Sequence, residues 1–96
     1  MVVFIMERVP VSLRGELTRW MLELKAGVFI GSISALVRDL LWQKVGHSLK
    51  SGSAILIHSS DTEQGFAIRY WGDTSRKVRD FEGLMLVGVE ENQGEF

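Results

Sequence analysis

The amino-acid sequence predicts an α+β fold, in which two helices pack on one face of a mainly antiparallel sheet. The chain has 96 residues, which is the size of a single domain. Hydrophobic residues make up 46% of it and charged residues 24%, so the chain has enough apolar surface to fold rather than stay disordered. Apolar runs with strand-like and helix-like spacing alternate along the sequence, and glycines stand between them.

A proline separates the first predicted strand from the first predicted helix. Residues 2–6 are consecutive apolar residues, as in a strand that lies at the centre of a sheet and is buried on both faces. Pro10 ends this strand, and Ser12 is the expected N-cap of a helix that Gly27 ends. The helix carries one apolar stripe, which consists of Leu13, Leu17, Trp20, Met21 and Leu24.

A second strand and a second helix come next. Residues 28–30 form a short strand between two glycines. The helix starts near Ser32 or Ser34, either of which can serve as its N-cap, and Gly46 is near its end. The apolar residues of this helix lie on one face and are Ile33, Leu36, Val37, Leu40, Leu41 and Val45.

The second half of the chain predicts a hairpin, a basic loop and a last strand. The order of strand, helix, strand, helix, hairpin and strand is that of the ferredoxin-like fold. Residues 1–89 therefore form one domain, and residues 90–96 form an acidic C-terminal tail. The expected strand, hairpin loop, strand, basic loop and last strand span residues 53–59, 61–65, 66–71, 72–82 and 84–89.

The aromatic residues divide between core and interface. We expect Trp20 and Trp42 in the core, because each belongs to an apolar stretch of a helix. Alternation along residues 66–71 places Arg69 and Trp71 together on one face of their strand. A small core leaves that face to be covered by a second copy of the chain, which predicts a homodimer.

The net charge of −1 hides an uneven distribution. The tail, residues 90–96, holds three acids and no base, so the other 89 residues carry eleven bases against nine acids, a net charge of +2. Basic groups of this kind suit phosphate binding, but they also occur on solvated surfaces that bind nothing. The two groups are Arg8, Arg14 and Arg19 near the first helix, and Arg76, Lys77 and Arg79 in the late loop.

Residue types exclude several classes of function. The chain has no cysteine, which excludes a disulfide scaffold, a cysteine nucleophile and a thiolate zinc site. His47 and His58 lack metal-ligand spacing, and neither a serine-nucleophile motif nor a phosphate-binding loop motif is present. No apolar run reaches the roughly 18 residues of a membrane span, and no signal peptide is recognisable. We therefore expect a cytoplasmic protein with no membrane partner.

Several short stretches are similar to one protein family. The most specific are Leu13-Arg14-Gly15 and Ala26-Gly27-Val28-Phe29-Ile30-Gly31. The chain resembles CRISPR-associated protein two, and within that family its subtype I-E branch. The other matching stretches, in order along nearly the whole chain, are Val9-Pro10, Ser34-Ala35 with Arg38, Trp42, Thr62-Glu63 with Gly65-Phe66, Gly72, and Gly83-Leu84 with Leu86-Val87.

This resemblance implies a function in CRISPR spacer acquisition. It implies a homodimer at the centre of a complex with two dimers of the integrase, CRISPR-associated protein one. The homodimer would hold duplex DNA through its phosphates, and the integrase would join the strands. Arg14 and Arg76 match DNA-contacting arginines of the family, and Lys77 follows Ser75, which replaces a further arginine. The implied DNA-binding set is Arg8, Arg14, Arg38, Arg76 and Lys77.

The resemblance also implies a candidate for catalysis and a segment that binds the integrase. The wider family has metal-dependent nuclease activity, assigned to an aspartate at the end of the first strand, and Glu7 occupies that position. Glu7 is thus the candidate catalytic and metal-binding residue, with magnesium as the ion; the scaffolding role does not require it. A metal-dependent endonuclease is the alternative function, and a ferredoxin-like regulatory or RNA-binding module is the third. The residues expected to bind the integrase are Leu84, Leu86, Val87, Glu90 and Glu91.

Overall fold

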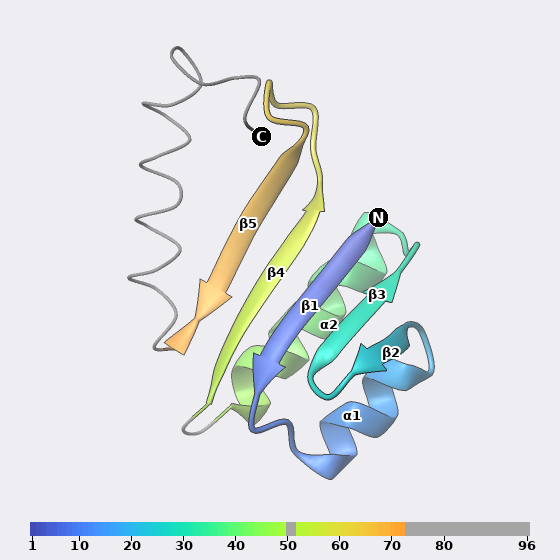
Figure 1. The fold of residues 1–96 in the computed structure, drawn as a ribbon, viewed down its shortest axis with the longest axis vertical. Helices are drawn as coiled ribbons and strands as arrows, with labels where there is room; N and C mark the ends of the chain where they lie inside the picture. The colour runs from blue at the N-terminus through green and yellow to red at the C-terminus, as the bar shows by residue number, and fades with distance from the viewer. Residues whose placement is uncertain (50–51, 73–96) are drawn as a thin grey trace.

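The computed structural model describes residues 1–49 and 52–72. Within these residues the strands form one sheet in the order β2-β3-β1-β4-β5, and every neighbouring pair is antiparallel (Figure 1). This confirms the α+β, ferredoxin-like fold and the central position of the first strand. The elements are β1 (Val2–Glu7), α1 (Val11–Thr18), β2 (Leu22–Lys25), β3 (Val28–Gly31), α2 (Ala35–Ser48), β4 (Ser53–Ser59) and β5 (Phe66–Trp71).

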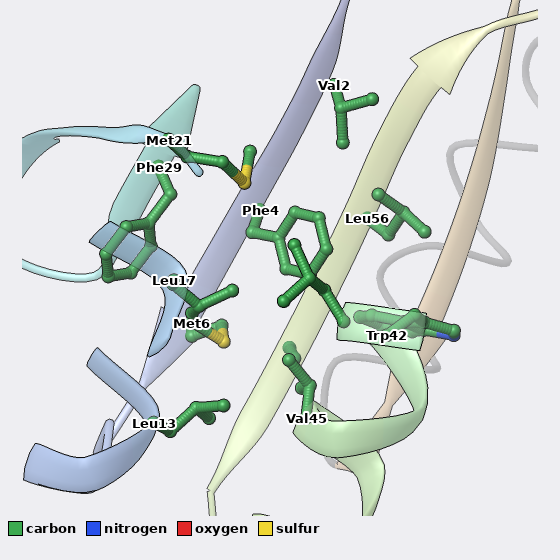
Figure 2. Close-up of a cluster of buried hydrophobic side chains, with 12 residues drawn as sticks. Val2, Phe4, Met6, Leu13, Leu17, Met21, Phe29, Trp42, Val45 and Leu56 are labelled. Atoms are coloured by element: carbon green, nitrogen blue, oxygen red, sulfur yellow. The ribbon is translucent and has the colours of Figure 1, made fainter. Parts of the chain in front are cut away.

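Both helices pack on the same face of the sheet, to which alternate residues of β1 point. Phe4 lies in the middle of this core and is fully buried (Figure 2). Its ring meets Trp42 of α2 edge to face, with ring centroids 5.9 Å apart. Burial of one large apolar side chain stabilises the fold by about 1.5–3 kcal/mol. The buried core consists of Val2, Phe4, Met6, Leu13, Leu17, Met21, Phe29, Leu41, Trp42, Val45, Ala54 and Leu56.

Helix α2 begins and ends close to the predicted positions. The backbone N–H of Val37 donates a hydrogen bond of 3.2 Å to the side chain of Ser34, which confirms this serine as the N-cap. The helix continues through Gly46 to Ser48. No helix within the described part of the chain is long and apolar enough to cross a membrane.

Helix α1 differs from its prediction at both ends. Pro10 is the residue before the helix and provides no side-chain cap, while Ser12 lies inside the helix. The helix ends at Thr18, and Leu22–Lys25 is strand β2 rather than a continuation of the helix to Gly27. This segment alternates between leucine and charged residues, which is the period of a strand, and it pairs with β3 in a hairpin.

The tryptophans lie differently from the prediction. Trp42 is in the core as expected, but Trp20 is 49% exposed, because the helix ends before it. Trp71 lies on the helix-covered face of β5 and stacks on Trp42, with ring centroids 5.6 Å apart. Arg69 is on the same face, 3.0 Å from the carboxylate of Asp39 in α2. Arg69 and Trp71 therefore lie on the face against which α2 packs, although Trp71 stays 43% exposed, and the homodimer stays a prediction.

The opposite face of the sheet carries apolar side chains and is covered by neither helix. In Figure 1, α2 lies behind the sheet, and this face is turned toward the viewer. Strand pairing sets its members, because residues opposite each other in an antiparallel pair point to the same side. We call it the uncovered face, and it consists of Val3, Ile5, Glu7, Leu22, Lys25, Val28, Ile30, Ser53, Ile55, Ile57, Ser59, Phe66, Ile68 and Tyr70.

Candidate nucleic-acid interface

Glu7 stands at the end of the central strand and at the margin of the uncovered face. It is exposed and lies opposite Ser53, the first residue of β4. The next residue, Arg8, has a φ of 59°, a left-handed conformation that is uncommon for any residue except glycine. This conformation turns the chain out of the sheet toward α1. The turn at Arg8 thus places the end of the strand with Glu7 directly before the segment that carries Arg8, Arg14 and Arg19.

Three glycines allow backbones to meet at this end of the sheet. A Cβ on Gly27 would overlap the carbonyl oxygen of Met6. A Cβ on Gly52 would lie 2.5 Å from the carbonyl oxygen of Glu7, and one on Gly72 would lie 2.5 Å from that of Gly52. Side chains cannot be accommodated at these distances, so the end of β1 is enclosed by the β2–β3 turn on one side and by the start of β4 on the other.

Arg14 projects from α1 beside the β2–β3 hairpin. Its Nε donates a hydrogen bond of 3.1 Å to Oε2 of Glu23 in β2. The same oxygen accepts a second bond of 3.1 Å from the backbone N–H of Gly27. The Arg14 side chain is 40% exposed and that of Glu23 is 22% exposed. Arg14 and Glu23 line a surface depression together with Lys25 and Ala26.

Arg38 lies on the helix-covered side of the sheet and belongs to a polar cluster. Its side chain is only 15% exposed, and its Nε lies 2.9 Å from Oδ1 of Asp39. The hydrogen bond and charge of Arg38, and then those of Arg69, hold the pKa of the Asp39 carboxyl below its usual value, against the opposing effect of its burial. The terminal NH1 of Arg38 is 3.1 Å from Nδ1 of His58, a buried residue of β4.

A second ionic group joins the two helices. Glu16 of α1 accepts a hydrogen bond of 2.8 Å from the ammonium of Lys44 in α2, and its other oxygen lies 3.8 Å from Arg19. The hydrogen bond and the charge of Lys44 lower the pKa of the Glu16 carboxyl. Arg19 and Lys44 therefore already face an acid of their own chain.

A comparison with known families covers most of the chain. Residues 1–86 match the model of a family described as CRISPR-associated protein (Cas_Cas2CT1978). The chain belongs to this Cas2 family. The resemblance seen in the sequence is thereby confirmed for the family, and the assignment to the subtype I-E branch stays a prediction.

The candidate site residues of this Cas2-family protein that lie in the described part of the chain are not gathered in one place. Glu7 and Arg8 are consecutive, and Arg14 follows on the helix that begins just after them. Arg38 is on the other helix, largely buried between Asp39 and His58. Other candidates lie outside the described residues, namely Arg76, Lys77, Leu84, Leu86, Val87, Glu90 and Glu91.

Glu23 is a site residue that sequence reasoning missed. Its signal was present: in Leu22-Glu23-Leu24-Lys25, strand periodicity places Glu23 on the face opposite its leucine neighbours. Only the strand interpretation of this segment directs Glu23 toward α1. With the segment treated as helix, Glu23 was one more charge on a solvated surface.

One protomer supplies few ligands for a magnesium ion at Glu7. Magnesium takes octahedral oxygen coordination, usually through one or two carboxylates together with water or phosphate. Within the described residues, no group of three or more metal-ligating side chains is present, and Glu7 makes no salt bridge. A magnesium site at Glu7 would therefore need ligands beyond the described residues of one protomer, for example a second copy of Glu7.

Proposed function

We propose that this Cas2-family protein is an architectural subunit of the CRISPR adaptation complex, which binds duplex DNA through its phosphates and scaffolds the integrase. The observation that carries the proposal is the uncovered face. Ile5 at its centre is 38% exposed and Leu22 at its edge is 64% exposed. A sheet with a largely apolar face that neither α1 nor α2 covers is expected to bury that face against another protein surface.

A second copy of the chain is the occupant that we propose for the uncovered face. All five strands contribute apolar residues to the face, which matches the large and hydrophobic interfaces of obligate homodimers, commonly about 2,000 Å² or more. Glu7 lies at its margin, so two-fold symmetry brings a basic segment that starts at Arg8 from each copy to the same assembly. The homodimer thus doubles the number of phosphate contacts.

Phosphate binding is proposed for Arg14 in the described residues, and for Arg76 and Lys77 from the sequence. Arg14 is 40% exposed, and its guanidinium borders a surface depression. Three contacts in each of two copies give an expected slope of log K against log salt of about −5. Contacts to phosphates carry no base specificity, so all duplex sequences should bind alike.

The test compares Arg14→Ala with Arg19→Ala in duplex binding at several salt concentrations. We expect Arg14→Ala to weaken binding to every sequence and to flatten the salt slope by about 2. Arg19 is the matched control, because it follows the same helix, is 73% exposed and faces Glu16. A wild-type protein with no salt-dependent affinity for duplex DNA would exclude the proposed function.

The C-terminal segment is the part that we propose to bind the integrase. Leu84, Leu86 and Val87 form an apolar stretch, and the acids that follow repel DNA but suit a basic partner. If this segment is the docking site, the integrase will co-elute with the full chain and not with a chain that ends at residue 82. Co-elution with a folded, shortened chain would exclude this part of the proposal.

A metal-dependent nuclease remains the second candidate function. The observation that favours it is the exposed carboxylate of Glu7 on the margin of the uncovered face. A dimer formed through this face would bring two such carboxylates to one interface, and two carboxylates are the usual protein contribution to a magnesium site.

A further inference from the structure

The bond between Arg14 and Glu23 uses only part of the guanidinium. An arginine side chain has five N–H donors in one plane, and Glu23 accepts from Nε alone. Within the described part of the chain, neither terminal nitrogen of Arg14 donates a hydrogen bond. The two terminal nitrogens form the end of the planar fork, which is the geometry that binds a phosphate through two parallel hydrogen bonds.

Glu23 is itself held in place. Its Oε2 accepts from the backbone N–H of Gly27 as well as from Arg14, and its side chain is mostly buried. Gly27 in turn accepts a hydrogen bond of 2.8 Å from the backbone N–H of Met6. The carboxylate is therefore fixed to the β2–β3 turn, and that turn is fixed to the central strand.

The negative charge of Glu23 opposes DNA binding, whereas its hydrogen bond to Arg14 favours it. A carboxylate beside an arginine reduces the net positive charge that a DNA phosphate meets. If charge alone decided affinity, any neutral residue at position 23 would improve DNA binding equally. The hydrogen-bond geometry and the charge of Glu23 thus make opposite contributions, which substitutions can separate.

We propose that Glu23 is a positioning residue that orients the guanidinium of Arg14 toward a DNA phosphate. This proposal rests on the proposed function, because it assumes that Arg14 binds duplex DNA. Glu23 fixes Nε, so Arg14 does not have to lose that side-chain freedom when DNA binds. Ordering a long side chain at an interface costs enough to change affinity by about threefold or more for each site.

The experiment measures duplex-DNA affinity of the full chain for Glu23→Gln and Glu23→Ala. Both variants remove the same charge, but only glutamine keeps an acceptor oxygen at the same distance along the side chain. We expect Glu23→Gln to bind at least as tightly as the wild type, and Glu23→Ala to bind about threefold or more weaker than Glu23→Gln. Equal affinities of the two variants would overturn the proposal.

Glu23→Gln and Glu23→Ala, each combined with Arg14→Ala, show whether the difference in duplex-DNA affinity depends on Arg14. We expect the difference between glutamine and alanine at position 23 to vanish in these double variants. A difference that persists would show that Glu23 acts through the hairpin alone, which also overturns the proposal. If Glu23→Ala does not fold, Glu23→Asp replaces it: aspartate keeps the charge but is one methylene shorter, so positioning predicts weaker binding and charge alone predicts wild-type binding.

These outcomes separate the present proposal from the proposed function. Absence of duplex binding by the wild type removes both. Duplex binding that Arg14→Ala weakens, together with equal affinities of Glu23→Gln and Glu23→Ala, removes only the role of Glu23. Duplex binding that Arg14→Ala leaves unchanged also removes the role of Glu23, while other basic residues can still carry the proposed function.

Discussion

The indole ring of Trp71 occupies the space where a side chain at position 46 of α2 would be. A Cβ built on Gly46 lies 2.9 Å from two ring carbons of Trp71. Glycine inside a helix is ordinarily unfavourable, because it gives up much backbone freedom on folding. Here it allows α2 to approach β5, while Trp42 of the same helix stacks on the ring of Trp71.

We expect Gly46→Ala to destabilise the fold, although alanine is the better helix former. The added methyl group would displace a ring that is already held by Trp42, and such overpacking costs about 1–3 kcal/mol. Gly15→Ala is the matched control, because Gly15 is also helical and a Cβ there meets no atom within 4 Å. We expect that control to stabilise by about 0.5–1 kcal/mol. Urea unfolding of both variants measures the difference, and a stabilised Gly46→Ala would contradict the packing argument.

Asp39 should make stability depend on acid pH. Its pKa is lowered in the folded protein by Arg38 and Arg69, so its contribution to stability is complete above the pKa of the unfolded chain, near 3.9. The contribution is lost as the pH falls through the lower folded pKa. Because the carboxylate is 45% exposed, we expect the loss to be no more than about 1 kcal/mol.

Asp39→Asn tests this dependence. The variant should be less stable than the wild type at pH 7, and the difference should shrink between about pH 5 and pH 2. Thermal unfolding followed across this range provides the measurement. A difference that stays constant with pH would show that the carboxylate charge has no part in holding Arg38 and Arg69.

A charge in the middle of the uncovered face should prevent formation of the proposed homodimer. Ile57 of β4 lies between Val3 of β1 and Ile68 of β5 on this face. We expect Ile57→Glu to sediment as a monomer at micromolar concentration and the wild type to sediment as a dimer, because an unpaired buried charge is strongly unfavourable. Leu36→Glu is the control, since Leu36 is 72% exposed on the helix side. Identical sedimentation of the two variants would exclude the uncovered face as the interface.

Substitution of Glu7 distinguishes the architectural function from the nuclease. We expect Glu7→Ala to leave spacer integration by the reconstituted complex essentially unchanged, and the isolated wild type to show little nuclease activity with magnesium. Glu63→Ala, which removes an exposed acid of the hairpin loop, is the control. A loss of integration of about tenfold, or about 1.4 kcal/mol of transition-state stabilisation, with normal assembly and DNA affinity would favour the nuclease.

The sequence predicted those elements whose pattern lies within their own residues. The central strand, helix α2 and the hairpin of β4 and β5 each have a clear apolar pattern and clear end signals, and their positions along the chain were confirmed. The predicted burial of the central strand on both faces was wrong, because Ile5 is 38% exposed. Residues 17–24 fit the helical spacing of the apolar stripe, while residues 22–25 also alternate as in a strand. The pairing of β2 with β3 decides between them, and this contact between segments is not visible in either segment alone.

The same reason explains which parts of the site were missed. Alternation along β5 correctly placed Arg69 and Trp71 on one face, but α2 determines which face is covered, through Asp39 and Trp42. Arg14 was identified from its resemblance to a DNA-contacting arginine. Its bond to Glu23 depends on the β2–β3 hairpin, which was not predicted from the sequence.

The central position of β1 has a consequence for biosynthesis. Residues 2–7 leave the ribosome before Ser53–Ser59, which are among their hydrogen-bonding partners. At about 5–20 residues per second, the chain waits roughly 3–10 s before β4 has been synthesised, and longer before it has cleared the exit tunnel. During this time the apolar first strand has no partner on one side. The nascent chain should therefore be a chaperone client, and the sheet should close only after β4 has emerged.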